Sequence, residues 1–352
     1  MNFPNLRCVA FCGLGFALAL GAFAAGPETR FAPKVVVVTT YEIGADTGDK
    51  PGEFQLWHER ENLTNRVEVP GVDHPLTHDG KGLWGMVSGT TVRAALQVQA
   101  LGLDPRFDLS RTYWLVNGIA GVDPADASVA SAAWAKWVVD GDIAYEVDSR
   151  EADPSWPYAI IPVGSKKPNE KPKVTEWEPA PMAWELNGEL VDWAFALTRD
   201  TVIPENEAMK PLRAAYKRFP NAQRPPFVLI GDTFGSCRYW HGPAMTRWAN
   251  DWARLQTGGR ANYVMTNMED QGIAHALSRL AAQKRVDWRR VLFLRTASNY
   301  CTPPDATGVA ESMLAEYEGL VPSLESAHRV GSKVVHALLK DWETFSAQTP
   351  KP

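Results

Sequence analysis

The sequence predicts an α/β fold, because short apolar segments typical of buried strands alternate with amphipathic helical segments. Residues 34–40 read Lys-Val-Val-Val-Val-Thr-Thr, and such a continuous β-branched run is typical of a strand buried on both faces. Residues 83–87 and 113–116 predict two further strands, and the helix expected over residues 91–101 has one apolar face. Polar, glycine-rich loops follow these strands, so we expect a site at the strand ends.

The second half of the chain continues this alternation. Three short apolar runs predict strands over residues 227–230, 262–266 and 291–296. Each run ends in a polar cluster: residues 231–233, 267–270 and 297–300. Helices are expected over residues 271–283 and 308–320.

Residues 151–226 differ in composition, since they hold 12 of the 26 prolines. Two amphipathic helices are expected within them, at residues 190–199 and 207–218. A linker between domains is the alternative interpretation, but the two amphipathic helices favour an excursion. We therefore interpret this segment as a proline-rich excursion within one domain over residues 26–352.

The first 25 residues have the three regions of a secretory signal peptide. Arg7 is their single charge, residues 9–20 are apolar, and residues 21–25 read Gly-Ala-Phe-Ala-Ala, which contains the small-residue pattern of a signal-peptidase site. A membrane anchor would need a longer apolar stretch. We therefore expect a secreted or periplasmic protein whose mature chain begins near residue 26.

Charge and motif content exclude several classes of protein. The 36 basic and 41 acidic residues give a net charge of −5, or −6 without Arg7 (35 against 41). This charge argues against a nucleic-acid-binding protein, because nucleic acids select basic surfaces. Beyond residue 25 no apolar run approaches the length of a membrane-spanning helix. No metal-binding spacing occurs, so we expect neither metal nor cofactor. The sequence leaves open whether Cys237 and Cys301 form a disulfide.

The last third of the chain carries the most specific motifs. Residues 268–276 read Met-Glu-Asp-Gln-Gly-Ile-Ala-His-Ala, which resembles the Met-Glu-x-x-x-Ile-Ala segment of the nucleoside phosphorylase-I superfamily. Residues 295–300, Arg-Thr-Ala-Ser-Asn-Tyr, resemble its Arg-x-x-Ser-Asp segment. Residues 87–90 resemble its helix entry, and residues 117–124 resemble its Gly-x-Ala-Gly turn. Residues 138–143 resemble the strand that follows this turn. These matches keep the superfamily's order.

Within that superfamily the chain is most similar to the purine nucleoside permeases, through residues 36–42 (Val-Val-Val-Thr-Thr-Tyr-Glu) and 268–272. The resemblance implies a three-layer α/β sandwich with a central mixed β-sheet, like that of nucleoside phosphorylases. It also implies a purine nucleoside as ligand, and a homo-oligomer in which a neighbouring subunit helps to close the site. Because no membrane span is predicted in the mature chain, we expect a soluble, exported nucleoside-handling protein.

The resemblance implies that Glu269, with Met268 beside it, binds the ribose. Breaking a purine N-glycosidic bond builds positive charge on the ribosyl ring, and a carboxylate that accepts hydrogen bonds from the ribose hydroxyls orients the sugar. Without the neighbouring motifs, Glu269 would be interpreted as a glutamate at a helix start. Thr90, Asn117 and Gly118 belong to loops expected to line the same site.

The purine base is expected to contact Asn299, Asn267, Trp240 and His241. Many superfamily members have an aspartate at the position of Asn299, where it protonates purine N7. A carboxamide is no general acid, but it can hydrogen-bond N7 and a 6-oxo group, as in trimeric phosphorylases that prefer inosine and guanosine. Trp240 stands where the superfamily has an aromatic that stacks on the base. Packing roles for Trp240 and His241, and a turn role for Asn299, remain alternatives.

The reaction type depends on whether phosphate binds. The superfamily's phosphorylases hold phosphate with a serine and an arginine, at positions occupied here by Ile119 and Val116. Four other arginines would have to supply the missing charge: Arg60, Arg66, Arg93 and Arg111. Phosphate therefore stays possible as a co-substrate, although no good phosphate site is visible.

The superfamily's hydrolases instead activate water with a carboxylate that follows the first strand. Glu42 and Asp46 follow the strand predicted over residues 34–40, and a desolvated glutamate can act as general base. The leading hypothesis is therefore hydrolysis of purine nucleosides, with Glu42, Asp46 and Asn299 as catalytic residues. The alternatives are phosphorolysis and a nucleoside-binding protein that assists transport without catalysis.

Overall fold

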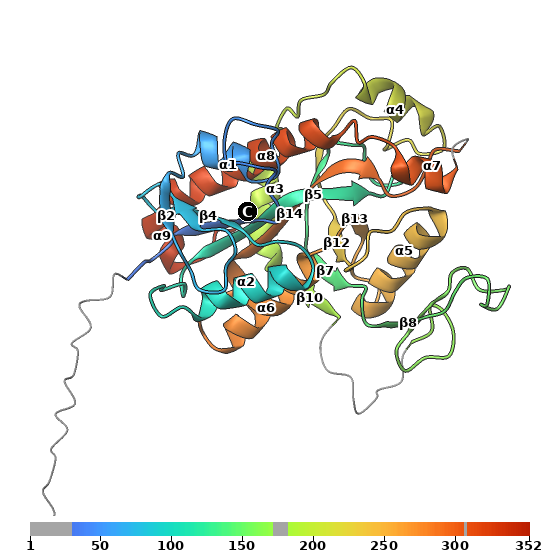
Figure 1. The fold of residues 1–352 in the computed structure, drawn as a ribbon, viewed down its shortest axis with the longest axis horizontal. Helices are drawn as coiled ribbons and strands as arrows, with labels where there is room; N and C mark the ends of the chain where they lie inside the picture. The colour runs from blue at the N-terminus through green and yellow to red at the C-terminus, as the bar shows by residue number, and fades with distance from the viewer. Residues whose placement is uncertain (1–29, 172–181, 306–307) are drawn as a thin grey trace, which may run out of the picture.

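The structure is a computed structural model that describes residues 30–171, 182–305 and 308–352. Its centre is a mixed sheet of 12 strands, and a separate pair of strands forms a hairpin. The predicted α/β fold with a central mixed sheet is therefore confirmed (Figure 1). The predicted signal peptide, residues 1–25, lies outside the described residues.

The strands of the central sheet have the following bounds: β1 (Val35–Thr39), β2 (Asn65–Val67), β3 (Leu76–His78), β4 (Leu83–Val87), β5 (Tyr113–Val122), β6 (Ala132–Trp134), β7 (Trp137–Asp140), β10 (Ala183–Glu185), β11 (Val228–Ile230), β12 (Asp232–Gly235), β13 (Tyr263–Asn267) and β14 (Val291–Tyr300). The hairpin consists of β8 (Ala144–Glu146) and β9 (Ile160–Pro162).

The main path through the sheet runs β10-β7-β12-β13-β5-β1-β4-β3-β2, and β14 pairs with both β5 and β6. The central pairs β1–β4, β1–β5 and β5–β14 are parallel, whereas β13 runs antiparallel to β5. The carboxyl ends of β1, β5 and β14 therefore lie along one edge of the sheet, next to the start of the helix that follows β13.

The helices have the following bounds: α1 (Gln55–Arg60), α2 (Val92–Leu103), α3 (Gly188–Thr198), α4 (Met209–Ala215), α5 (Pro243–Thr257), α6 (Asp270–Ala282), α7 (Val309–Leu314), α8 (Leu320–Lys340) and α9 (Trp342–Ala347), with a short 3₁₀ helix at Trp288–Arg290. Helices α1 and α8 cover one face of the sheet, while α2 and α6 pack together on the other (Figure 1). This is the expected three-layer arrangement.

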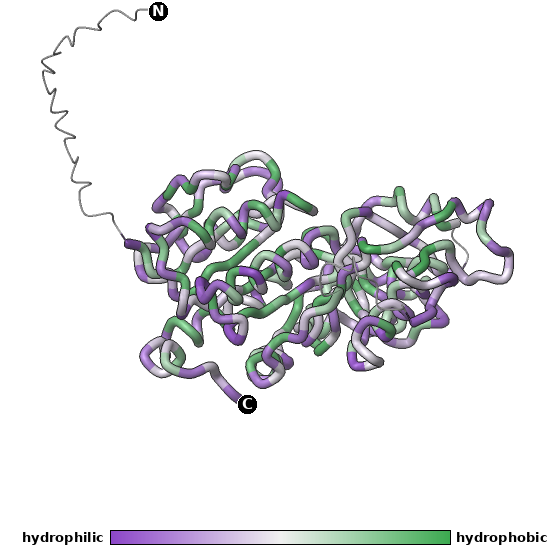
Figure 2. The backbone as a smooth tube through the Cα atoms, turned by 90° about the horizontal axis from the view of Figure 1, so that it is seen from below, coloured by the Kyte–Doolittle hydropathy of each residue, from purple (hydrophilic) through white to green (hydrophobic). Residues whose placement is uncertain are grey.

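The core explains why the first strand is so apolar. All four valines of β1 are completely buried, because helices cover both faces of the sheet at this point. Figure 2 shows the hydrophobic backbone segments concentrated in the interior, with hydrophilic segments along the outer helices and loops. A second cluster of buried residues, rich in aromatic side chains, surrounds Trp248 on α5.

Two strands are longer than predicted. β5 continues through residues 117–121, where we expected a turn, and β14 continues through residues 297–300, where we expected a polar loop. The two strands pair in parallel from Trp114 and Val291 onward, so each supports the other beyond its apolar stretch. Gly118 lies within β5 and not in a turn. A glycine is needed there because the side chains of Arg295 and Glu53 come so close to the backbone that a Cβ would collide with them.

Other boundaries were predicted with mixed success. The helices expected over residues 91–101, 190–199 and 271–283 correspond to α2, α3 and α6. The helix expected over residues 308–320 was wrong in extent, because α7 ends at Leu314 and α8 begins at Leu320. The expected polar cluster at residues 231–233 lies largely in β12. Among the described helices, none is both long enough and apolar enough to cross a membrane.

Candidate functional site

A cluster of buried charges lies where β5, β14 and the start of α6 meet. At its centre is Arg295 of β14, whose side chain is 1% exposed. Its Nη1 lies 2.8 Å from Oε1 of Glu269, and its Nε lies 3.1 Å from both carboxylate oxygens of Asp270. A third carboxylate, Glu53, has Oε1 3.9 Å from the same Nη1. One guanidinium thus faces three buried carboxylates.

Asn267 fixes the position of two of these carboxylates. Its Oδ1 accepts hydrogen bonds from the backbone N–H groups of Glu269 (3.2 Å) and Asp270 (2.9 Å), which orients the first residues of α6. Its Nδ2 donates to Thr233 Oγ1 (2.6 Å) and to Asp270 Oδ2 (2.8 Å). Asn267, predicted to contact the base, therefore has all of its polar atoms occupied by this network.

Glu53 is the member of the cluster that sequence reasoning missed. It lies two residues before α1, and its Oε2 accepts hydrogen bonds from the backbone N–H and the hydroxyl of Thr40, both at 2.7 Å. Its Oε1 accepts from the N–H of Ile119 at 2.7 Å. The loop after β1 returns to the sheet edge and brings in Glu53. No local motif marks this residue.

Burial dominates the electrostatics of the cluster. Burial, reinforced by the neighbouring charges of Glu53 and Asp270 and opposed by Arg295, raises the pKa of Glu269 to about 7. Burial likewise raises the pKa of Glu53, although Arg295 and three hydrogen bonds oppose this. Burial alone would lower the pKa of Arg295, but Asp270 and Glu269 raise it above its ordinary value. The guanidinium therefore stays charged while Glu269 titrates near neutrality.

The two carboxylates predicted to activate water lie elsewhere. Glu42 accepts hydrogen bonds from the backbone N–H groups of Ile43, Gly52, Phe54 and Gln55, so it organises the loop that leads into α1. Asp46 has Oδ1 2.7 Å from His74 Nε2 and Oδ2 3.5 Å from Arg66 Nη1. The structure brings Glu53, and not Glu42 or Asp46, next to Glu269. Glu42 and Asp46 are nearer to β1 in sequence, but amides of the loop bind Glu42, and His74 and Arg66 bind Asp46.

Asn299 lies near the end of β14 beside several hydroxyl groups. Its Oδ1 accepts a hydrogen bond from Ser298 Oγ at 2.9 Å. Its Nδ2 donates to Tyr239 Oη and to the carbonyl oxygen of Tyr300, both at 3.1 Å. Tyr317 in turn donates to Tyr239 Oη at 2.8 Å. Tyr239 was not predicted, although it precedes the predicted Trp240.

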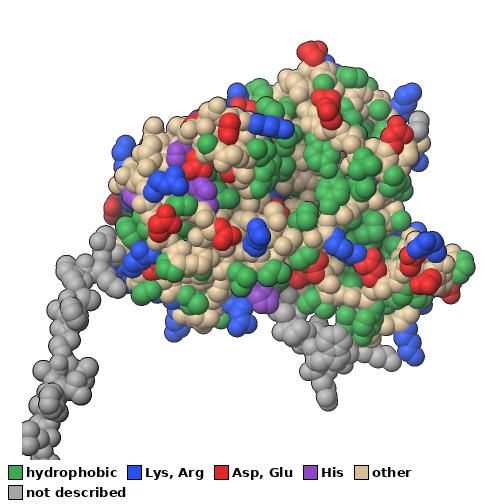
Figure 3. Space-filling model, viewed as in Figure 1, with side chains coloured by type: hydrophobic (Ala, Val, Ile, Leu, Met, Phe, Trp, Pro, Cys, Tyr) green, Lys and Arg blue, Asp and Glu red, His purple; other side chains and the backbone are tan. Residues whose placement is uncertain are grey.

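A cavity of about 20 Å³ is lined by Asn299 and by Asn267, whose amide donates to Asp270 of the charged cluster. Met268, Asn267, Asn299, Trp240 and Tyr239 are among the residues that line it. Figure 3 shows this face of the molecule hollowed near its centre, with hydrophobic side chains along the hollow. Since a purine ring needs more space than this, the rim of the cavity has to move when a ligand of that size enters.

Besides Glu269, Asn267 and Asn299, three predicted residues reach the cavity or the cluster. Met268 lines the cavity, and its N–H donates to Glu269 Oε2 at 3.0 Å. Gly118 lies against Arg295 and Glu53. Trp240 lines the cavity too, but its indole is buried and packs edge-to-face against Phe234 and Trp248.

The remaining predicted residues hold the surroundings together. Thr90 lies in the loop before α2, where the next residue, Thr91, donates its N–H to the carbonyl oxygen of Met268 at 3.1 Å. Asn117 is buried, and it accepts a hydrogen bond from Trp57 Nε1 at 2.9 Å. His241 Nε2 lies 3.0 Å from Ser312 Oγ on α7, and burial lowers the pKa of His241.

Cys237 and Cys301 are both free thiols, Cys237 exposed and Cys301 buried. The structure therefore does not support a disulfide between them. Of the arginines considered for phosphate, Arg60 pairs with Glu325 and Arg66 with Asp46. Within the described part of the chain, no group of three histidine, cysteine, aspartate or glutamate side chains is arranged to hold a metal ion.

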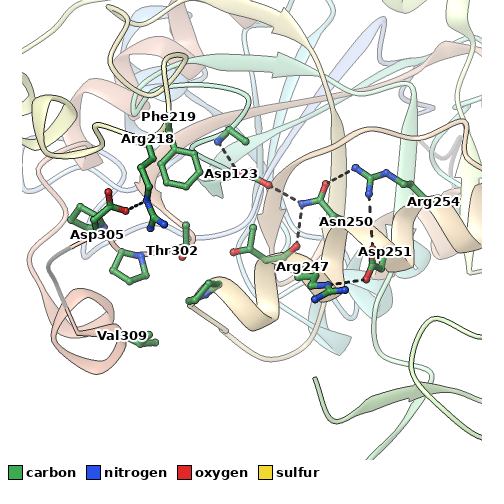
Figure 4. Close-up of a pocket in the computed structure, with 15 residues that line it drawn as sticks. Asp123, Arg218, Phe219, Arg247, Asn250, Asp251, Arg254, Thr302, Asp305 and Val309 are labelled. Atoms are coloured by element: carbon green, nitrogen blue, oxygen red, sulfur yellow. Dashed lines mark hydrogen bonds and ion pairs between the residues drawn. The ribbon is translucent and has the colours of Figure 1, made fainter. Parts of the chain in front are cut away.

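A larger cavity of about 620 Å³ lies beside α5, away from the charged cluster (Figure 4). Arg218 pairs there with Asp305, and Arg247 lies 3.7 Å from Asp251. Arg254 lies 4.0 Å from the same aspartate. Each guanidinium has a carboxylate of the pocket itself as neighbour, so we assign no ligand to this cavity.

Comparisons with solved structures agree with this fold. A 5'-methylthioadenosine/S-adenosylhomocysteine nucleosidase from Neisseria meningitidis superposes with a TM-score of 0.51 at 15% identity, covering 86% of this chain and 99% of the nucleosidase. A futalosine hydrolase of Helicobacter pylori superposes with a TM-score of 0.53 at 12% identity, covering 87% of this chain and 98% of the hydrolase. At such low identity these similarities establish the nucleoside phosphorylase-like fold alone.

Comparisons of sequence extend along nearly the whole chain. A purine nucleoside permease of Candida albicans is 26% identical over 328 residues, covering 90% of this chain and 77% of the permease. A probable purine nucleoside permease of Schizosaccharomyces pombe is 27% identical over 334 residues, covering 91% of this chain and 93% of that permease. The model of the purine nucleoside permease (NUP) family matches residues 32–350. The chain is therefore a member of the purine nucleoside permease family.

Proposed function

We propose that this protein binds a purine nucleoside at the charged cluster and hydrolyses its N-glycosidic bond. The observation that carries this proposal is the buried group of Glu53, Glu269, Asp270 and Arg295, in which three carboxylates face one guanidinium. With every group ionised the cluster has a net charge of −2. Such a site stabilises positive charge on a ribosyl ring and repels a phosphate dianion.

Each residue has a role that follows from its position. Glu269 accepts hydrogen bonds from the ribose hydroxyls, and Arg295 orients its carboxylate. Glu53 replaces Glu42 and Asp46 as the proposed base. A water molecule adds to C1′ and gives a proton to Glu53 while the bond from C1′ to N9 breaks. The base leaves as an anion, stabilised by a hydrogen bond from Asn299, and takes a proton from solvent.

Phosphorolysis is less well supported. Arg295, the arginine at the centre of the cluster, is already engaged by carboxylates, and Arg60 and Arg66 pair with Glu325 and Asp46. We therefore expect the release of free ribose from inosine, at a rate that does not increase with added phosphate. Ribose 1-phosphate formed only in the presence of phosphate would contradict hydrolysis and favour the phosphorylase.

A second candidate function is nucleoside binding without turnover. One observation favours it: Glu53 already accepts three hydrogen bonds from Thr40 and Ile119, and these weaken it as a base. The names of the fungal relatives also refer to permeation and not to cleavage. Tight binding of inosine with no product, with or without phosphate, would support this candidate instead.

The deciding variant is Glu53→Gln, with Glu185→Gln as its matched control. Loss of a general base lowers the rate by about 10² to 10⁴, and the glutamine keeps the shape of the side chain. We expect this loss in kcat for Glu53→Gln, with the affinity for inosine changed by less than about tenfold. Glu185→Gln should keep its kcat, because Glu185 is an exposed carboxylate that pairs with Arg260 outside the charged cluster. A wild-type kcat in Glu53→Gln would overturn the assignment of the base.

A further inference from the structure

The Tyr239 hydroxyl has a position that the proposed reaction does not use. It lies 3.1 Å from Asn299 Nδ2 and 2.8 Å from the hydroxyl of Tyr317. The Asn299 amide has a defined orientation, because Ser298 Oγ donates to its Oδ1 and the carbonyl of Tyr300 accepts from its Nδ2. The amide nitrogen, and not the oxygen, therefore faces Tyr239.

Both of these neighbours donate to Tyr239. An amide nitrogen can only donate, and the hydroxyl of Tyr317 also donates to Tyr239 Oη. With two hydrogen bonds accepted, the remaining capacity of the Tyr239 hydroxyl is its own proton. Burial raises the pKa of Tyr239 above its ordinary value, so the proton is retained at neutral pH.

Two donors thus stand side by side at the cavity, the Asn299 amide and the Tyr239 hydroxyl. A ligand edge with two adjacent acceptors can accept one hydrogen bond from each. The N7 and O6 atoms of a 6-oxopurine form such an edge, whereas a 6-aminopurine presents one acceptor and one donor. Tyr239 is 43% exposed, so its ring can move outward as the base replaces the Asn299–Tyr239 hydrogen bond.

We propose that Tyr239 is the specificity-determining residue that selects 6-oxopurine nucleosides, by donating to O6 while Asn299 donates to N7. The proposal rests on the proposed nucleoside site, but it does not depend on catalysis. A site that only binds nucleosides would have the same preference.

Calorimetric titration of the full mature chain tests this proposal with inosine, adenosine and purine riboside, which has no substituent at C6. One hydrogen bond is worth about tenfold in affinity. We expect the wild type to bind inosine about tenfold more tightly than purine riboside, and adenosine no better than purine riboside. In Tyr239→Phe the affinity for inosine should fall about tenfold, while that for purine riboside stays within about twofold.

Tyr317→Phe is the matched control, because it removes a neighbouring hydroxyl and leaves the Tyr239 donor in place. It should keep the preference for inosine over purine riboside. An equal loss for all three nucleosides in Tyr239→Phe would show a structural role and overturn the proposal. Equal wild-type affinity for all three would overturn it while leaving the proposed function intact. If the wild type binds none of them, the proposed function itself is wrong, and this inference falls with it.

Discussion

Two groups of arginines and carboxylates in this molecule differ chiefly in their exposure. In the pocket beside α5, Arg247 and Arg254 are 66% and 60% exposed, and they approach Asp251 at 3.7 and 4.0 Å. In the cluster at the sheet edge, Arg295 is 1% exposed and lies 2.8 Å from Glu269. Water screens the first group of charges, whereas the protein itself has to balance the second.

The difference shows where the chain tolerates an electrostatic cost. A pair such as Arg247 and Asp251 contributes little to stability, because the arginine remains hydrated and the two ions are 3.7 Å apart. Three carboxylates around one buried arginine leave excess negative charge. Burial, reinforced by the charges of Glu53 and Asp270, raises the pKa of Glu269 to about 7. Perturbed groups of this kind concentrate at functional sites. The smaller cavity is therefore the better candidate for a ligand, although the other is larger.

The largest effect should come from removing the buried guanidinium. Arg295→Met leaves the carboxylates of Glu269 and Asp270 without their cationic partner, and breaking a buried pair in this way costs about 3–5 kcal/mol. Arg254→Met, in the exposed group, should change the free energy of unfolding by no more than about 0.5 kcal/mol. Urea unfolding followed by circular dichroism measures both. A similar loss of unfolding free energy in both variants would contradict the proposed difference between the buried cluster and the exposed group beside α5.

The next effect concerns binding at the cluster. Glu269→Gln keeps the size of the side chain but removes the charged acceptor of the ribose hydroxyls, so inosine should bind about 100-fold more weakly. Glu185→Gln removes an exposed carboxylate that pairs with Arg260, and it should leave the affinity unchanged. Calorimetry gives both dissociation constants. Wild-type affinity in Glu269→Gln would remove the cluster from consideration as the ribose site.

The smallest effect is a dependence of binding on pH. With a pKa of about 7, Glu269 changes from mostly protonated to mostly ionised between pH 6 and pH 8, and the ionised form accepts the ribose hydroxyls. The affinity of the wild type for inosine should rise by up to about tenfold over this range. The same titration of Glu269→Gln should show a flatter profile, and equal slopes would assign the titration to another group.

The same shift has the opposite sign for stability. The pKa of Glu269 is about 7 in the folded protein and near its ordinary value of 4.5 in the unfolded chain, so the folded state binds more protons between these values. This contribution to stability is fully present below pH 4.5 and is lost as the pH rises through 7. Between pH 5 and pH 8, the free energy of unfolding should therefore decrease more in the wild type than in Glu269→Gln.

Much of the architecture was predictable from apolar patterning. The valines of β1 and the apolar face of α2 identify elements whose burial is decided locally by their own side chains. The long strand β5 was not predictable in the same way. Its second half, including Gly118, is stabilised by pairing with β14, nearly 180 residues later in the chain.

The candidate site shows the same division. The motif around Glu269 marks the residue proposed to bind ribose, and the end of β14 marks Asn299, because their types and spacing are local properties of the chain. Glu53 and Tyr239 have no such motif. They reach the site only because the loop after β1 and the segment after β12 return to the same edge of the sheet.

The sequence by itself determined the class of fold, the family and the side chains able to hold a ribose. Only the tertiary structure decided which carboxylate accompanies Glu269, since Glu42, Asp46 and Glu53 are chemically alike and all follow β1. The physical reason is burial: backbone amides bind Glu42 and the partly exposed His74 binds Asp46, whereas Glu53 is enclosed against Arg295. Selection among like residues depends on desolvation, which is a property of the folded chain.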